Sequence, residues 1–240
     1  MSMLPPTEQR HPLSTNLDQL ETLEMVRLMN RLDATIPLVI AEVLPQIAQV
    51  VDWMVATLAA EGRIFYQGAG TSGRLAVLDA AELLPTFSLP PGKVIALLAG
   101  GPNALIHSIE GAEDDETLGK YDLLAHHFGA RDMLIGVAAS GRTPYVLGGL
   151  GYAQGCGART AVVVCTPDSP MAAVAQSAIA VVTGPEVLTG STRLRAGTAQ
   201  KMVLNMLSTC SMVKLGKAYG NLMVDVQPTN RKLRQRAEFQ

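Results

Sequence analysis

Residues 63–73 read Arg-Ile-Phe-Tyr-Gln-Gly-Ala-Gly-Thr-Ser-Gly, and this stretch decides the fold. The segment 63–67 is short and mostly apolar, which is typical of a strand buried on both faces of a parallel sheet. The glycines and hydroxyl residues that follow favour a turn into a helix, which we expect over residues 72–83. A buried strand followed directly by a helix is the repeating unit of α/β folds.

The alternation of strand and helix continues along the chain. Further strands are expected at residues 94–98, 133–138, 160–165 and 179–183. Further helices are expected at residues 103–110, 115–128, 144–154, 171–175 and 193–215, and two more, 17–31 and 36–60, precede the first strand. The pattern predicts an α/β fold: a three-layer αβα sandwich with a five-stranded, mostly parallel sheet and an N-terminal helical arm.

Composition limits the kinds of function. The chain has 240 residues, of which 48% are hydrophobic, so it can bury one large core. A net charge of -2 with 17% charged residues gives no general electrostatic basis for binding nucleic acid or an anionic membrane, and leaves a small-molecule ligand open. Polar residues interrupt the apolar segment 36–60, which we interpret as a core helix and not as a membrane span.

The three cysteines indicate the cellular setting. Cys156, Cys165 and Cys210 form neither an even set nor a Cys-x-x-Cys pair, so neither a disulfide framework nor a zinc site is expected. Residues 1–16 are polar, contain several prolines and lack the pattern of a signal peptide. We therefore expect a cytoplasmic protein with a flexible N-terminus over residues 1–16.

Two strand-to-helix junctions combine glycine with hydroxyl residues. Their candidate ligand residues are Gly70, Thr71 and Ser72 in the first, and Ser140, Gly141, Arg142 and Thr143 in the second. Helix N-termini with free N–H groups and nearby hydroxyls suit a phosphate monoester. The alternative for each junction taken alone is that Ser72 and Thr143 only cap helices. Because ligands of open α/β sheets bind at the carboxyl ends of strands, the two junctions together favour a phosphate site.

The first junction also fits the pattern Gly-x-Gly-x-x-Gly, through Gly68, Gly70 and Gly73. A dinucleotide site requires an acidic residue at the end of the next strand, and that strand ends in Leu-Leu-Ala-Gly-Gly, residues 97–101. A dinucleotide cofactor is therefore disfavoured.

A third loop, with Ser191 and Thr192, precedes the long helical segment 193–215. Its hydroxyls and the nearby Arg195 and Lys201 would suit an anion, and the alternative is an ordinary helix cap with solvated basic residues. The chain has no Walker A sequence, so a P-loop hydrolase is not supported.

Two acidic residues are candidates for proton transfer. Glu82 lies in the otherwise apolar stretch 80–85, where a buried carboxyl would suit proton transfer near neutral pH; the alternative is an exposed helix end. Glu113 begins an acidic run, for which the alternative is a solvated turn with Asp114 or Asp115 as a helix cap. The histidines show no metal-ligand spacing, so no metal site is expected.

Five segments carry a resemblance to a known family. They are residues 66–75 (YQGAGTSGRL), 110–114 (EGAED), 136–145 (GVAASGRTPY), 189–201 (TGSTRLRAGTAQK) and 220–225 (GNLMVD). In order and spacing the chain, from about residue 17 to 233, resembles bacterial N-acetylmuramic acid 6-phosphate etherases. This family has the sugar isomerase (SIS) fold and is related to the glucokinase regulatory protein.

The resemblance implies a lyase that removes D-lactate from the C3 ether of N-acetylmuramic acid 6-phosphate without a cofactor or metal. It implies that Glu82 and Glu113 are the catalytic acid and base, in an order left open. The two glycine junctions would hold the 6-phosphate, and Ser191 and Thr192 would help to enclose the sugar. A homodimer with a site built from both subunits is expected, through the N-terminal helices and residues 193–215.

The resemblance also suggests boundaries: a SIS domain with N-terminal helices over residues 17–233, and residues 234–240 as the start of a C-terminal region otherwise absent. Two functional alternatives remain open. One is a non-catalytic sugar-phosphate-binding regulatory protein, and the other is a sugar-phosphate isomerase.

Overall fold

The computed structural model describes residues 4–225, and its centre is a sheet of five strands. The strands are β1 (Ile64–Gly68), β2 (Val94–Leu98), β3 (Met133–Ala138), β4 (Arg159–Val164) and β5 (Ser177–Ala180), in the order β2-β1-β3-β4-β5. Every pairing within this sheet is parallel. The predicted five-stranded α/β sheet is confirmed.

Alternation along the strands divides the core into two layers. Ile64 and Tyr66 of β1 pack into one buried cluster, and Phe65 between them packs into the other. Strands β3 and β4 alternate in the same way, as side chains of period two must when both faces are covered. The two clusters lie on opposite faces of the sheet.

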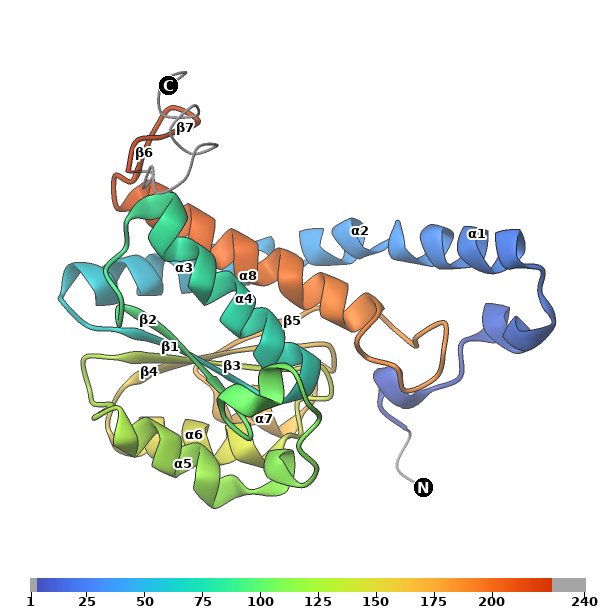
Figure 1. The fold of residues 1–240 in the computed structure, drawn as a ribbon, viewed down its shortest axis with the longest axis horizontal. Coiled ribbons are helices and arrows are strands. Elements are labelled where there is room, and N and C mark those ends of the chain that lie inside the picture. Colours follow the sequence, from blue (N-terminus) through green and yellow to red (C-terminus); the bar gives the residue numbers. More distant parts are fainter. Residues whose placement is uncertain (1–3, 226–240) are drawn as a thin grey trace.

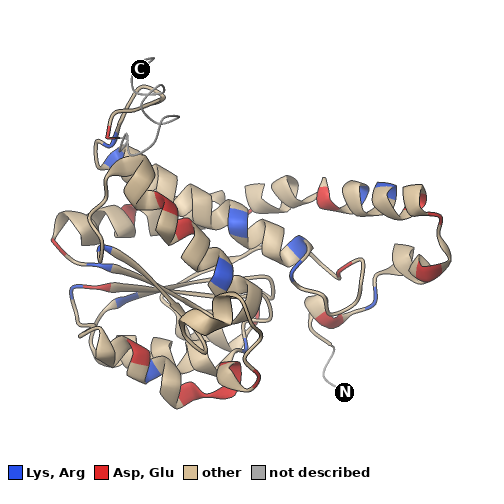
Figure 2. Ribbon diagram, viewed as in Figure 1, with Lys and Arg blue, Asp and Glu red and all other residues tan. Residues whose placement is uncertain are grey.

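Helices cover both faces (Figure 1). On one face lie α3 (Leu44–Ala59), α4 (Gly70–Phe87) and α8 (Arg195–Lys214); on the other lie α5 (Glu116–Ala125), α6 (Pro144–Gly155) and α7 (Pro170–Val174). The three-layer sandwich is confirmed. After α8 comes a short hairpin of β6 (Ala218–Tyr219) and β7 (Leu222–Met223). Basic and acidic residues are interspersed over the helices and loops (Figure 2).

The helical arm consists of α1 (Thr22–Asp33) and α2 (Ile36–Ala41), and it extends beyond the edge of the sheet (Figure 1). The single helix expected over residues 36–60 is wrong, because the chain breaks between α2 and α3. Pro45 has no N–H to donate to the carbonyl of Ala41, so the helix cannot continue through it. The segments 22–41 and 44–59 meet at a bend of 64°. Within residues 4–225, no single helix is long and apolar enough to cross a membrane.

The expected helix over residues 103–110 is also wrong. Only Pro102–Leu105 forms a 3-10 turn, and a second 3-10 turn follows at Ala112–Asp114. Gly100, Gly101 and Gly111 bracket the segment with φ angles of 84°, 69° and 74°. Ile106 is 83% exposed, so no apolar stripe holds a helix against the sheet. Residues 99–115, here termed the acidic loop, therefore run irregularly along the sheet edge.

Smaller differences occur at the ends of elements. Strand β5 begins at Ser177, earlier than expected, because Ser177 and Ala178 pair with Ala161 and Val162 despite their low strand propensity. Residues 4–20 contain the 3-10 turns Pro6–Glu8, Pro12–Ser14 and Leu17–Gln19, the last lying in a segment expected to be helical. The expectation for residues 234–240 lies outside the described residues.

Helices α5 and α6 pack closely against each other at Gly119. A Cβ atom added there would lie 1.7 Å from the carbonyl oxygen of Tyr145, so Gly119→Ala would force the helices apart. We expect a loss of about 1–3 kcal/mol in the free energy of unfolding, measured by urea denaturation. Gly151→Ala is the matched control, because it lies in α6 with open space around it and should stabilise the chain by roughly 0.5–1 kcal/mol. Equal effects of the two changes would contradict this packing argument.

Candidate functional site

The candidate site lies at the carboxyl ends of β1 and β3, where the strand order changes direction: β2 was added on one side of β1, and β3 and the later strands on the other. β2 pairs with β1 on one side and β3 pairs with β1 on the other. The loops that follow β1 and β3 therefore leave the same edge beside each other. In open α/β sheets this switch point is where ligands bind. Both glycine junctions singled out in the sequence lie here.

A pocket of about 240 Å³ opens beside the first junction. Gly70 and Arg74 of α4 line one side, and Glu110 and Glu113 of the acidic loop line the other. The structure thus brings Gly70 and Glu113 to the same pocket. Glu113 is exposed, so its carboxylate is accessible to a ligand. We term this space the loop pocket.

The first junction is partly committed to internal contacts. Gly70, with φ 52°, begins α4. The buried Ser72 hydroxyl donates to Oε1 of Gln200 on α8 at 2.9 Å. A Cβ at Gly197 would lie 3.4 Å from the methyl carbon of Thr71, so Thr71 also lies against α8. The Ser72 side chain therefore joins α4 to α8. What the first junction can still offer an anion is the backbone N–H groups of its turn.

The second junction is more open. Ser140 Oγ accepts from the N–H of Arg142 at 3.3 Å, and the Arg142 side chain is exposed. Gly141 has φ 65°, and a Cβ there would lie 2.2 Å from Ser169 Oγ, so only glycine fits. Thr143 occupies the cap position of α6 without a side-chain cap bond, which leaves its hydroxyl available. Thr143 thus stands at the cap position of α6, as the capping alternative expected, but its side chain does not make the capping hydrogen bond.

In the third loop the capping alternative is wrong, because neither Ser191 nor Thr192 caps α8. The two oxygens of the buried Glu186 accept from the N–H groups of Arg195 and Ala196, each at 2.9 Å. Burial raises the pKa of Glu186, and these N–H groups oppose that rise. The sequence reasoning missed Glu186; an acidic residue after Gly-Pro just before a helix was the available signal. Ser191 and Thr192 remain half-buried in the loop, without this capping role.

Glu82 lies elsewhere. It is exposed near the far end of α4, so of the two alternatives the exposed helix end holds and burial does not. It lines a second pocket of about 500 Å³, here the helix pocket, with Asp79, Asn205 and Ser208. Twelve residues of helix separate Gly70 from Glu82, which corresponds to roughly 18 Å at about 1.5 Å per residue. Within one chain, Glu82 and Glu113 therefore do not share a pocket.

Asp79 is a buried carboxyl that the sequence reasoning missed, although it stands in the apolar run 76–84. It accepts from Asn205 Nδ2 at 2.8 Å and from Ser208 Oγ at 3.0 Å, and its second oxygen has no partner among the described residues. Burial raises the pKa of Asp79, and the bonds from Asn205 and Ser208 partly offset that rise. Asp79 thus joins α4 to α8 at the floor of the helix pocket.

This raised pKa predicts a pH-dependent stability difference between the wild type and Asp79→Asn. The folded state holds the Asp79 proton more tightly than the unfolded chain does. Its stabilisation is fully present below the pH at which an exposed aspartate titrates, and is lost as pH rises through the folded-state value. In urea denaturation from pH 4 to 8, the wild type should lose stability relative to the variant as pH rises. A difference that is constant or of opposite slope would contradict this.

Comparisons with known proteins agree with the fold. A model of the glucokinase regulatory protein N-terminal SIS domain matches residues 46–154. A phosphoheptose isomerase structure from Francisella tularensis superposes with a TM-score of 0.66 at 18% identity, covering 81% of this chain and all of that chain. The Vibrio vulnificus NanR protein, complexed with ManNAc-6P, gives a TM-score of 0.57 at 13% identity, covering 95% of this chain and 70% of that one. These two likenesses show the fold alone.

Two relatives in sequence are much more similar. The N-acetylmuramic acid 6-phosphate etherase of Pectobacterium atrosepticum is 60% identical over 231 residues, which cover 96% of this chain and 76% of the relative. The protein of the same name from Streptomyces coelicolor is 56% identical over 231 residues, 96% of this chain and 74% of that one. In both cases the matched region covers nearly the whole of this chain. The chain belongs to the N-acetylmuramic acid 6-phosphate etherase family.

Proposed function

We propose that the chain is a carbon–oxygen lyase that converts N-acetylmuramic acid 6-phosphate and water into N-acetylglucosamine 6-phosphate and D-lactate, in the recycling of peptidoglycan. Membership in the etherase family supports the substrate class. The observation that carries the proposal in the structure is the loop pocket, which places Glu113 opposite the glycine junction at the switch point.

The phosphate contacts follow from the two junctions. The N–H groups at the start of α4 and the second junction, with the free hydroxyl of Thr143, supply donors for the 6-phosphate. Ser191 and Thr192 flank the start of α8 and help to enclose the sugar.

The chemistry requires one base and one acid. In the open-chain sugar, the C1 aldehyde acidifies the C2 proton. A carboxylate removes that proton, the C3–O bond breaks, and the lactate oxygen takes a proton as it leaves. Water then adds at C3 of the unsaturated aldehyde, and C2 regains a proton. We assign Glu113 to the C2 proton and Glu82 to the leaving oxygen.

The separation of the two glutamates favours a site shared between two chains. Glu82 lies roughly 18 Å along α4 from Gly70, at about 1.5 Å per residue, and Gly70 lines the loop pocket together with Glu113. A monosaccharide phosphate cannot bridge that length. We propose a homodimer in which Glu82 of one chain approaches the loop pocket of its partner. Leu23, Val26 and Leu38 of the arm are 58%, 57% and 70% exposed, and such apolar side chains are candidates for the dimer contact.

The remaining expectations belong to the same proposal. The ligand is a small sugar phosphate, with no nucleic acid or membrane partner, and the location is cytoplasmic. The functional unit is the SIS domain with its N-terminal helices, residues 17–233.

The direct test is D-lactate release from N-acetylmuramic acid 6-phosphate by the purified chain. Release of D-lactate supports the lyase. Binding of the sugar phosphate without release would favour the regulatory alternative, to which the match over residues 46–154 gives specific support. Interconversion of sugar phosphates without lactate would favour an isomerase.

A further inference from the structure

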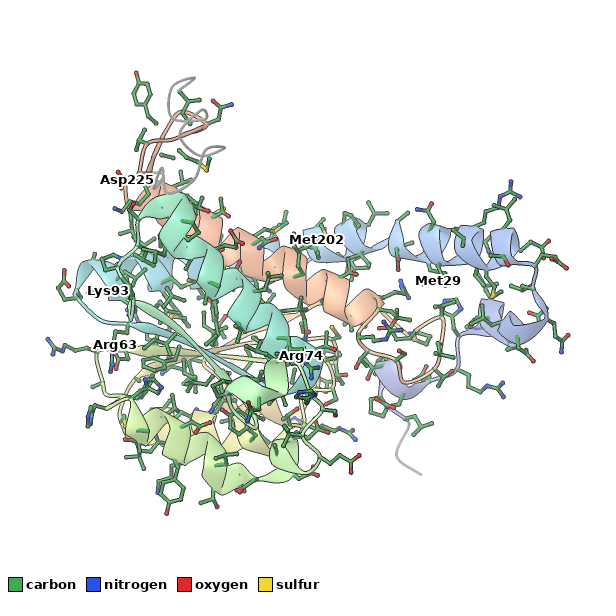
Figure 3. All side chains as sticks on the ribbon, viewed as in Figure 1. Met29, Arg63, Arg74, Lys93, Met202 and Asp225 are labelled. Carbon is green, nitrogen blue, oxygen red and sulfur yellow. The ribbon has the colours of Figure 1, made fainter. Side chains whose placement is uncertain are left out.

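Arg74 connects the two sides of the loop pocket. It lies on α4, four residues after Gly70, and its side chain reaches the acidic loop (Figure 3). Its Nε donates to the carbonyl oxygens of Ala104 and Leu105 at 2.9 and 3.1 Å, and one Nη donates to that of His107 at 3.2 Å. A single guanidinium thus fastens the irregular segment that leads to Glu113.

The charge of Arg74 has no counter-ion among the residues that the structure describes. Across residues 4–225, no carboxylate oxygen lies within 4.0 Å of its guanidinium, although Glu110 and Glu113 line the same pocket. Its bonds go to neutral carbonyls, and its second Nη has no hydrogen-bond partner in this part of the chain. A half-buried guanidinium with free donors in a pocket is suited to bind a carboxylate or phosphate.

The proposed substrate carries two anions, a phosphate and the carboxylate of its lactyl group. The carboxylate is one carbon from the ether oxygen on C3, and therefore close to the C2 proton assigned to Glu113. The phosphate is on C6, at the other end of the open chain, and the glycine junctions supply its donors. The anion nearest to Glu113 is the carboxylate. Because the Arg74 side chain crosses from the Gly70 side of the pocket to the segment that leads to Glu113, the carboxylate is also the anion expected at its free Nη.

We propose that Arg74 binds the lactyl carboxylate of the substrate while holding the acidic loop that carries Glu113. This inference rests on the proposed function. It makes Arg74 a specificity-determining residue, which distinguishes the ether substrate from sugar phosphates that lack a carboxylate. It also makes binding and the placement of Glu113 depend on the same side chain.

The test compares two ligands by titration calorimetry in the Glu113→Gln background, where substrate is not consumed. With Arg74→Gln added, the dissociation constant of N-acetylmuramic acid 6-phosphate should rise roughly 10- to 100-fold, as expected for loss of a charged hydrogen bond. That of N-acetylglucosamine 6-phosphate should change less than about threefold, because it has no carboxylate to lose. Arg74→Lys keeps the charge but not the planar array of donors of the guanidinium, so it should raise the dissociation constant of N-acetylmuramic acid 6-phosphate less than Arg74→Gln does.

A second readout addresses the loop. Hydrogen exchange of residues 102–113 should be faster in Arg74→Gln and Arg74→Lys than in the parent, with residues 140–143 unchanged. Arg131→Gln is the control and should leave the exchange of residues 102–113 unchanged, because Arg131 is exposed at the opposite edge of the sheet, just before β3.

Equal weakening of both ligands, or no weakening of either, would overturn the proposal, as would unchanged exchange in the loop. Because these are binding and exchange measurements, they are separate from lactate release. Absence of release from the parent would refute the lyase, while selective loss of the lactyl ligand would still support Arg74 as its receptor.

Discussion

Replacing Glu113 with glutamine is expected to lower D-lactate release by on the order of 10²- to 10⁴-fold, the usual contribution of a general acid or base. Glutamine keeps the shape of the side chain but cannot accept the C2 proton. Glu113 lines the loop pocket opposite Gly70, and its exposed carboxylate makes no ion pair within residues 4–225. The fold should therefore be unaffected, and the loss should appear in kcat.

The matched control is Glu116→Gln, three residues further on, where the carboxylate is exposed and does not line the pocket. It should retain full activity. Turnover in deuterium oxide assigns the roles: Glu113→Gln should abolish deuterium incorporation at C2, while Glu82→Gln should lose lactate release but keep the exchange. The reverse result would interchange acid and base, and full activity of Glu113→Gln would remove it from the mechanism.

Mixing two inactive variants is expected to restore activity. If Glu82 and Glu113 in one site come from different chains, a dimer of Glu82→Gln with Glu113→Gln contains one site with both changes and one with neither. Random pairing makes half of the dimers mixed, so about one quarter of wild-type activity should return. The measurement is lactate release after the two variants are unfolded together and refolded.

The control is each variant refolded alone, which should stay inactive. If both glutamates of a site came from the same chain, every site in the mixture would lack one of them, and no activity would return. That outcome would contradict the shared site and would require the acidic loop or α4 to move substantially. Sedimentation of the wild type as a monomer at micromolar concentration would contradict it as well.

The sheet could be predicted from the sequence because its strands are short, apolar and regularly spaced. Strands at 94–98 and 133–138 agree with the prediction to the residue. The errors arose where backbone geometry overrides composition. Pro45 divides one expected helix, and glycines with positive φ at both ends of residues 100–111 prevent another. The proline was a local signal that the apolar periodicity of residues 36–60 masked, whereas the φ angles of the glycines depend on where the loop packs, which periodicity does not reveal.

Part of the candidate site could also be predicted, because its position follows from the predicted strands. Its loops follow strands, so their convergence at one edge follows from topology. The roles of Ser72, Asp79 and Glu186 depend on contacts with α8, more than one hundred residues from Ser72 and Asp79 in the chain and nine or ten from Glu186. No local pattern encodes the distant partners of Ser72 and Asp79. The separation of Glu82 from Glu113 likewise depends on α4 being one continuous helix.

The carboxylate of Glu186 has a consequence for the number of charges that a ligand can carry. Of the three long helices that begin at this edge, α4 and α6 start without an acidic partner, whereas α8 has its first N–H groups occupied by Glu186. We therefore expect a single phosphoryl group to bind between α4 and α6, and a polyphosphate chain to find no free N–H donors at these first positions of α8. On this basis monophosphates should bind more tightly than nucleotides such as ATP, without any steric barrier.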